Sequence, residues 1–179
     1  MANQRLTDKS ALEQQTGSGD LFMVVDVSDT TGSSAGTSKK IDSKYIIQTD
    51  KFSLNNAEVQ ALSHGASPKT LVGALTGYMV TPISATVLVT HAGSNEGGNK
   101  ILLFGYDTSS TFTYWVSASK FYNGETVDRA YVFSGDQPAF GVYASGTILN
   151  KPFMMWSSGA FTGGWSMDVY ITYCYTKVL

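Results

Sequence analysis

Strict alternation of apolar and polar residues marks the carboxy-terminal end of the chain. Between residues 165 and 176, every second position is apolar and small polar residues fill most of the others. The apolar positions are Trp165, Met167, Val169, Ile171, Tyr173 and Tyr175. Because successive side chains of a strand point to opposite faces, this pattern predicts a long strand whose apolar set faces the core.

A second alternating segment runs from residue 79 to residue 91. It places one apolar set on a common face, opposite a set of threonines and Ser84. The set expected in the core is Met79, Ile83, Ala85, Val87 and Val89. Pro82 cannot donate a backbone hydrogen bond to a neighbouring strand, so it indicates an edge position or a bulge near the start of this strand.

Shorter apolar runs, separated by turn residues, predict further strands between these two segments. They cover residues 100–106, 111–119, 129–133, 139–144 and 153–156. The intervening turns are rich in Gly, Asn, Asp and Ser, which favour the backbone conformations of turns. Seven or eight antiparallel strands in this part of the chain predict an all-β fold, a β-sandwich that is most simply a jelly roll.

The composition changes part-way along the 179-residue chain. Residues 1–70 are rich in charge but contain only three aromatic residues, Phe22, Tyr45 and Phe52. We therefore expect two parts: an arm over residues 1–66 and a sandwich over residues 67–179.

The arm itself contains only short apolar segments. Residues 21–25 predict a short strand, and Ile41 follows after a polar loop, residues 28–40, that is too rich in Gly, Ser and Thr to pack. Helical turns are expected over residues 10–15 and from the N-cap Asn55 through Leu62, with Gly65 as a stop signal. Elements this short gain order by lying on their own chain, on a sister subunit or on another protein.

Charge and composition exclude several classes of partner. The formal net charge is −2 and no basic run is present, so a nucleic-acid partner is not expected. No stretch approaches the apolar length of a membrane span, and the polar amino terminus has no apolar signal core, which indicates synthesis in a cytosol. Cys174 is the sole cysteine and cannot form an intramolecular disulfide.

The sequence offers little catalytic or metal-binding chemistry. His64 and His91 are the only histidines, and neither lies in a motif that activates a nucleophile. Two histidines and one cysteine do not make a zinc site, and the acidic residues lack calcium-loop spacing. We therefore expect no enzyme activity, no cofactor and no metal. A calcium ion at a loop and a hydrolase acting through Asp128 or Asp136 are the open alternatives.

Three aromatic residues are candidate contact positions. Trp115 shares its face with threonines and serines, while Tyr114 and Val116 lie on the apolar face. It is either a subunit contact or a platform for a sugar, or else it sits in a bulge or under a covering layer within the monomer. Tyr131 and Trp156 lie in segments with apolar residues on both faces. This surplus of apolar faces predicts oligomer contacts.

One segment resembles a known family. Asp20 leads the apolar run of residues 21–25, Arg5-Leu6-Thr7-Asp8 precedes it, and the end reads Gly36-Thr37-Ser38-Lys39-Lys40-Ile41. This pattern, which covers about a quarter of the chain, is similar to a recurrent amino-terminal module of tailed-bacteriophage virion proteins, found in tail fibres, tail spikes and head fibres. The resemblance implies a virion-attachment piece, with capsid or other virion proteins as partners, and commonly a homotrimer.

The chain lacks the shaft repeats of long receptor-reaching fibres, so the resemblance favours a capsid decoration or a short head fibre. We expect a non-enzymatic structural protein of the virion, made in the host cytoplasm. The residues expected to dock the arm are Leu21, Phe22, Val24, Val25 and Ile41, and those expected to contact other subunits or a ligand are Trp115, Tyr131 and Trp156. The alternative is a tail-fibre or baseplate-associated receptor-binding module that recognises a host-surface glycan.

Overall fold

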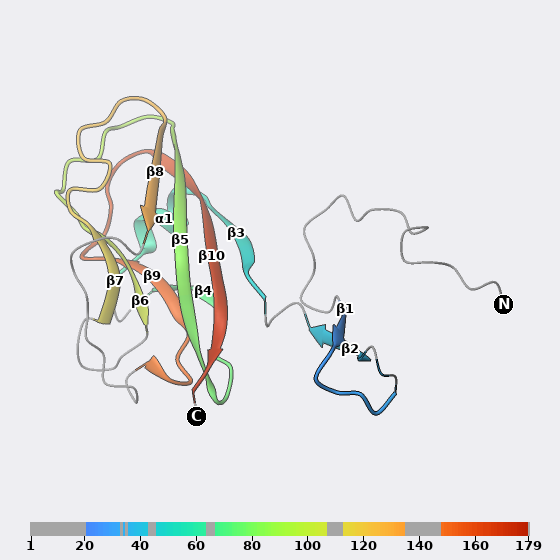
Figure 1. Ribbon diagram of the computed structural model, residues 1–179. Helices are drawn as coiled ribbons and strands as arrows, with labels where there is room; N and C mark the ends of the chain where they lie inside the picture. The colour runs from blue at the N-terminus through green and yellow to red at the C-terminus, as the bar shows by residue number, and fades with distance from the viewer. Residues whose placement is uncertain are drawn as a thin grey trace. The chain divides into compact units, whose positions relative to one another are not determined.

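The chain divides into two compact units, Met1–Ile46 and Ile47–Leu179. The computed structural model describes residues 21–32, 34, 36–42, 46–63, 67–106, 113–134 and 148–178. The first unit contains β1 (Leu21–Asp26) and β2 (Thr37–Asp42), which pair as an antiparallel hairpin (Figure 1). The helical turn expected over residues 10–15 and the strand expected over residues 139–144 lie outside the described residues.

The second unit is a sandwich of two four-stranded antiparallel sheets (Figure 1). Its elements are β3 (Gln48–Leu54), α1 (Asn56–Ala61), β4 (Lys69–Val72), β5 (Tyr78–His91), β6 (Leu102–Tyr106), β7 (Thr113–Ala118), β8 (Arg129–Ser134), β9 (Phe153–Ser157) and β10 (Trp165–Lys177). One sheet has the order β3-β10-β5-β8 and the other β4-β9-β6-β7. No helix in this described part of the chain is long and apolar enough to cross a membrane.

The strand order shows how the sandwich is wound. Strands pair in nested fashion, β3 with β10, β4 with β9, β5 with β8 and β6 with β7, as in one long antiparallel ribbon. Rolling that ribbon brings β5 beside β10 and β6 beside β9, which adds the two remaining ladders. This is the winding of an eight-stranded jelly roll, so the predicted all-β sandwich is confirmed.

The boundary of the sandwich differs from the one expected at residue 66. Strand β3 pairs with β10 along its whole length, from Gln48 opposite Tyr173 to Leu54 opposite Met167. Leu54 and, in α1, Val59 are buried in the core. The segment reads as part of a charged arm because most of its residues are polar, yet these few apolar side chains complete the sandwich. Strand β4, four residues long, was not anticipated either.

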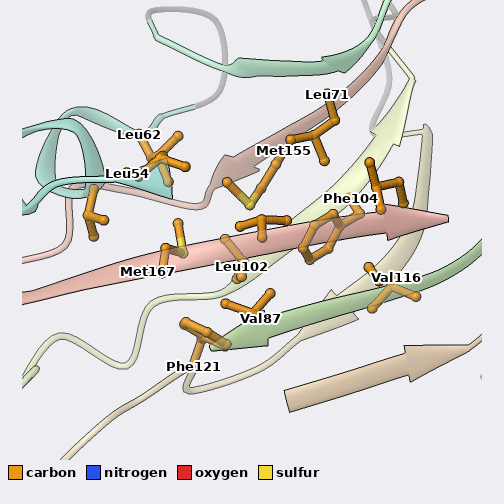
Figure 2. Packing of buried hydrophobic residues seen from close by; sticks show 14 of the residues in the cluster. Leu54, Leu62, Leu71, Val87, Leu102, Phe104, Val116, Phe121, Met155 and Met167 are labelled. Atoms are coloured by element: carbon orange, nitrogen blue, oxygen red, sulfur yellow. The ribbon is translucent and has the colours of Figure 1, made fainter. Parts of the chain in front are cut away.

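The core lies between the two sheets. All the residues of β10 predicted to face inward are buried, except Tyr175, which is partly buried. Figure 2 shows Val87 and Met167 of one sheet close to Leu102 and Phe104 of the other. Because full burial of such a side chain contributes about 1.5–3 kcal/mol, this packing between the sheets is the main source of stability.

A β-bulge changes the predicted face of β5. Ser84 pairs with Thr172 and Pro82 with the next residue of β10, so Ile83 is the extra residue. Val80 is therefore buried before the bulge, and Ile83 is 38% exposed. The bulge indicated by Pro82 is present, although β5 is a central strand; the prediction that Ile83 faces the core is wrong because the bulge shifts the alternation by one residue.

A buried carboxylate ties together the loops at one end of the sandwich. Glu96, in the β5–β6 loop, accepts backbone hydrogen bonds from Thr162 (2.8 Å), Gly163 (2.9 Å) and Gly98 (3.1 Å). Its own carbonyl accepts from the N–H of Gly124 in the β7–β8 loop (2.8 Å). Burial raises the pKa of Glu96, but these bonds to the carboxylate outweigh it and hold the pKa below its usual value. We call this arrangement the Glu96 clasp.

Helix α1 attaches to the same end of the sandwich. The side chain of Asn55 accepts from the N–H of Glu58, whose carboxylate accepts from the N–H of Asn55. This capping box confirms the predicted N-cap. The side-chain amide of Asn56 donates to the carbonyls of Gly163 (2.8 Å) and Trp165 (3.0 Å), so the helix supports the β9–β10 loop.

We expect Gly163→Ala to destabilise the sandwich by about 1–3 kcal/mol, because overpacking a tight site costs about that much. A Cβ at Gly163 would lie 2.6 Å from Trp165 Cδ1 and 2.9 Å from the backbone N of Glu96. Gly97→Ala is the matched control, since a Cβ there meets nothing within 4 Å. Urea unfolding of both variants measures the difference, and equal losses would contradict this account of Gly163.

Candidate functional site

The described residues expose large apolar side chains in two main places. Four of them belong to the hairpin of the first unit and four to β5, β8 and the loop before β8 in the sandwich, with Ile47 between these groups in the sequence. They are Met23, Val24, Val25 and Val27 in the hairpin, and Ile83, Leu88, Val127 and Val132 in the sandwich. Because exposed apolar clusters mark interaction sites, these two surfaces are the candidate functional sites.

The hairpin presents apolar groups on both of its faces. Phe22 lies opposite Ile41 on one face, and Met23 lies opposite Lys40 on the other. Met23 is 63% exposed and Val25, on the same face, is 58% exposed. A two-stranded hairpin is marginally stable in water by itself. The exposed apolar side chains of this hairpin are therefore of the kind that a binding partner covers.

The turn of the hairpin uses its carboxylates internally. Asp26 accepts hydrogen bonds from the N–H (3.0 Å) and hydroxyl (2.6 Å) of Ser28. Asp29 accepts from the N–H (3.1 Å) and hydroxyl (2.6 Å) of Thr31 and pairs with Lys39 Nζ (2.5 Å). These contacts order part of the loop that was expected not to pack. They also satisfy the acidic groups, so the hairpin offers a partner chiefly aliphatic surface and lysine.

All of the residues expected to dock the arm lie in this hairpin. Leu21 begins β1 opposite Asp42, while Phe22 and Ile41 are half-buried against each other. Val24 and Val25 are exposed. A shallow, open hollow on the hairpin is lined by Phe22, Met23, Ser38, Lys39 and Lys40. The structure thus brings the predicted residues together, and their docking stays a prediction.

The second surface is the outer face of the sheet β3-β10-β5-β8. Its β5–β8 half carries Leu88 opposite Ala130, and Val132, which is 72% exposed. Its β3–β10 half is polar, with a salt bridge between Lys51 and Asp168 (2.9 Å). The exposed large apolar side chains of this outer face therefore lie in its β5–β8 half, which we call the β5–β8 face.

Trp115 lies in a β-bulge. The pairing of β7 with β6 skips Trp115, which is partly buried and packs edge-on against the buried Phe153 with ring centroids 6.0 Å apart. Of the two alternatives left open by the sequence, the structure has the bulge that turns the ring toward its own chain. Trp115 therefore does not form an exposed platform.

The other two candidate contact residues are also turned toward their own chain. Trp156 is 2% exposed and pairs with the buried Leu103. Tyr131 is half-buried, and its ring lies 4.6 Å from that of Phe121. The large apolar residue of β8 that reaches solvent is Val132, which the sequence indicates only as part of an apolar run. Its alternation with Tyr131 was the signal that could have identified it.

The titratable groups near the Glu96 clasp form hydrogen bonds within the sandwich. His91 Nδ1 lies 3.1 Å from the hydroxyl of Tyr122, which donates to the carbonyl of Val127 (3.0 Å). Asp128 accepts from the backbone N–H of His91 (2.8 Å). No group of three His, Cys, Asp or Glu among the described residues could hold a metal ion. His64 and Asp136 lie outside those residues.

Solved structures of viral particles contain chains that are similar to this one at low sequence identity. No family model matches it, and no curated protein matches it. It is similar to a chain of the cyanophage Pam1 capsid asymmetric unit, with a TM-score of 0.38 and 10% identity over 98% of this chain and 99% of that one.

Two further solved structures show weaker similarity. One is an expanded particle of equine rhinitis A virus, a picornavirus (TM-score 0.30, 11% identity, 99% of this chain and 88% of that one). The other is the native virion of Kashmir bee virus (TM-score 0.30, 9% identity, 96% of each chain). At these TM-scores and identities the likeness assigns no function, which has to be argued from the chain's own surfaces.

The ion pair in the hairpin turn leads to a prediction about the pKa of Asp29. The contact with Lys39, followed by the hydrogen bonds from Thr31, lowers the pKa of Asp29 from 3.8 to about 2. A lowered folded-state pKa means that this contribution to stability is present above pH 4 and is lost as the pH falls towards 2. We expect carboxyl NMR to follow Asp29 titrating near pH 2, and Lys39→Met to raise that value. An unchanged pKa in the variant would show that the ion pair is not formed.

Proposed function

We propose that this protein is a non-enzymatic structural component of a tailed-phage particle, either a capsid decoration or a short head fibre. The observation that carries the proposal is the hairpin β1–β2, which forms a unit separate from the sandwich and exposes aliphatic side chains on both faces. It also contains the segment that resembles a virion-attachment module. Its role is to anchor the jelly roll to the particle.

The physics of a lone hairpin supports this role. Within the described residues, β1 and β2 pair only with each other, so each has one edge whose backbone groups are available to another strand. An exposed edge can add to a sheet of a partner, with backbone hydrogen bonds giving affinity and alternate side chains giving specificity. Met23 and Val25 on one face and Val24 on the other would then become buried in the partner.

The sandwich supports the role of a rigid projecting body. The chain enters it at Gln48, where the hydroxyl of Tyr173 hydrogen-bonds to Asp50 (2.9 Å). The Glu96 clasp lies at the opposite end of β3 and β10, beside Trp165. The seven residues of β3 span roughly 20 Å at about 3.4 Å per residue. Within the sandwich, the clasped loops therefore lie at the end away from Gln48, where the chain enters.

Removing residues 1–46 should leave a folded sandwich that no longer joins particles. Full-length and truncated proteins would be mixed with phage particles assembled without this protein, and binding followed by co-sedimentation. Val25→Asp should weaken binding because it places a charge on the exposed apolar face, whereas Thr30→Asp, in the exposed turn, is the matched control. A truncated protein that is unfolded, or that still joins particles, would contradict the proposal.

We also propose that the protein is a homo-oligomer, a trimer as the resemblance implies, and that its subunits meet at the β5–β8 face. The support is the location of Leu88 and Val132, which are exposed on the same face of two paired strands, with Val132 opposite Thr86 and Leu88 opposite Ala130. A specific interface of standard size buries about 800 Å² on each partner, and a charge at its centre is costly.

Val132→Glu should therefore dissociate the oligomer while leaving the sandwich folded. Light scattering coupled to size exclusion gives the mass, and circular dichroism gives the fold. Ser117→Glu, at an exposed position of β7 in the other sheet, is the control and should remain oligomeric. A monomeric parent protein, or an oligomer that survives Val132→Glu, would rule out this interface.

The alternative of glycan recognition through a tryptophan finds no support in the described surfaces. Trp156 and Trp165 are buried, and Trp115 is packed against the core. A receptor-binding role would have to use other residues, and no arrangement among the described ones favours it.

A further inference from the structure

The β7–β8 loop contains the only Asn-Gly pair in the sequence, Asn123-Gly124. Glycine has no Cβ, so its backbone nitrogen can approach the side-chain carbonyl carbon of a preceding asparagine with little steric hindrance. Attack forms a five-membered succinimide and releases ammonia, after which water opens the ring to aspartate or isoaspartate. Asn123 is partly exposed and Gly124 is exposed, so water has access to both.

In the folded protein, both groups that must react are held in hydrogen bonds. The N–H of Gly124, the nucleophile, donates to the carbonyl of Glu96 (2.8 Å). The side-chain carbonyl of Asn123, the electrophile, accepts from the backbone N–H of Asn99 (3.2 Å). The backbone of Asn123 also forms an isolated β-bridge with Glu96 and donates to the carbonyl of Lys120 (3.1 Å). Ring closure requires the side chain and the peptide to rotate, which these bonds resist.

Rearranging the loop around Asn123-Gly124 has a high free-energy cost. Lys120, Tyr122 and Gly124 have φ angles of 53°, 56° and 73°, in the left-handed region. Such a conformation is costly for residues other than glycine and persists only where the surroundings hold it. Phe121 and Tyr122 are buried, and both rings pack on Trp165. Moving Asn123 far enough to react therefore means withdrawing buried aromatic rings.

We propose that Asn123-Gly124 is a deamidation site that the Glu96 clasp keeps unreactive in the folded protein. Deamidation occurs when the loops joined by the clasp separate. The step breaks the bond between Cγ and the side-chain nitrogen of Asn123 and forms one from Cγ to the nitrogen of Gly124. The side-chain nitrogen leaves as ammonia with the proton from Gly124, and water then adds across the ring. The net change is asparagine and water to an acidic residue and ammonia.

Loss of ammonia makes the change one-way, and the isoaspartate product also alters the backbone. It routes the backbone through the former side chain and adds a methylene to the chain between Asn123 and Gly124. The N–H of Gly124 can then no longer reach the carbonyl of Glu96 with the rest of the β-bridge in place. If the loops stay open long enough for the reaction, the protein therefore keeps a permanent covalent change at Asn123. This inference concerns the sandwich alone and does not depend on the proposed virion role.

The first test compares the full chain folded and unfolded. Both samples are kept at mildly alkaline pH, one in buffer and one in concentrated urea, and the peptide containing Asn123 is followed by mass spectrometry. Reaction through a rare open state is slowed by the fraction of time spent open, so we expect deamidation at least about tenfold slower in the folded protein. Equal rates in the two samples would overturn the proposal.

The second test loosens the clasp by one side chain. Glu96→Gln removes the charge and one acceptor oxygen from the bonds to Thr162 and Gly163. Deamidation at Asn123 should become several-fold faster in buffer and stay unchanged in urea. Glu58→Gln makes the same chemical change at the exposed cap of α1 and should leave both rates unaltered.

Circular dichroism distinguishes loop opening from loss of the fold in these variants. A Glu96→Gln protein that keeps its strand signal and deamidates faster supports the proposal. One that keeps its fold and deamidates at the parent rate would overturn it. If Glu96→Gln unfolds, Thr162→Val is used instead, since it removes only the hydroxyl contact with Glu96 (3.2 Å), and the same two outcomes apply.

Discussion

The pairing of β5 with β10 is the interaction on which the rest of the structure depends. These are the two longest strands, and their ladder runs from Trp165 opposite His91 to Lys177 opposite Tyr78. Strand β3 adds to one side of this pair and β8 to the other. Alternate residues of both strands face the opposite sheet. Of the two ladders created by rolling the ribbon, this one joins the residues that lie farther apart in the sequence.

Two bulges decide which apolar groups this framework buries and which it leaves for partners. At Ile83 the extra residue shifts the alternation of β5 and puts a large aliphatic side chain partly in solvent. At Trp115 the extra residue in β7 has the opposite result and packs the ring on Phe153. A bulge inserts a single unpaired residue into a strand, yet each of these moves a large side chain between the core and the surface.

The molecule contains one tightly tied region and one weakly supported region. At the loop end, a carboxylate with no exposed surface is stabilised by backbone N–H groups from three residues of two loops. A buried charge is tolerable only when it is hydrogen-bonded in this way. The hairpin has two strands, no core of its own in the described residues and several exposed aliphatic side chains. Stability is therefore concentrated in the sandwich, and the hairpin is the part suited to gain order from a partner.

The sequence by itself determined the elements whose signals are local. Alternation located the core face of β10, Asn55 marked the start of α1, and the Asp-led apolar run located the hairpin residues expected to dock, because each of these depends on neighbours a few positions apart. Only the tertiary structure decided that β3 belongs to the sandwich, that Trp115 packs on Phe153 and Trp156 is buried, and that Val132 reaches solvent. The physical reason is that bulges and sheet pairing are set by contacts between residues far apart in the chain, and they decide which side of an otherwise ambiguous apolar segment is covered.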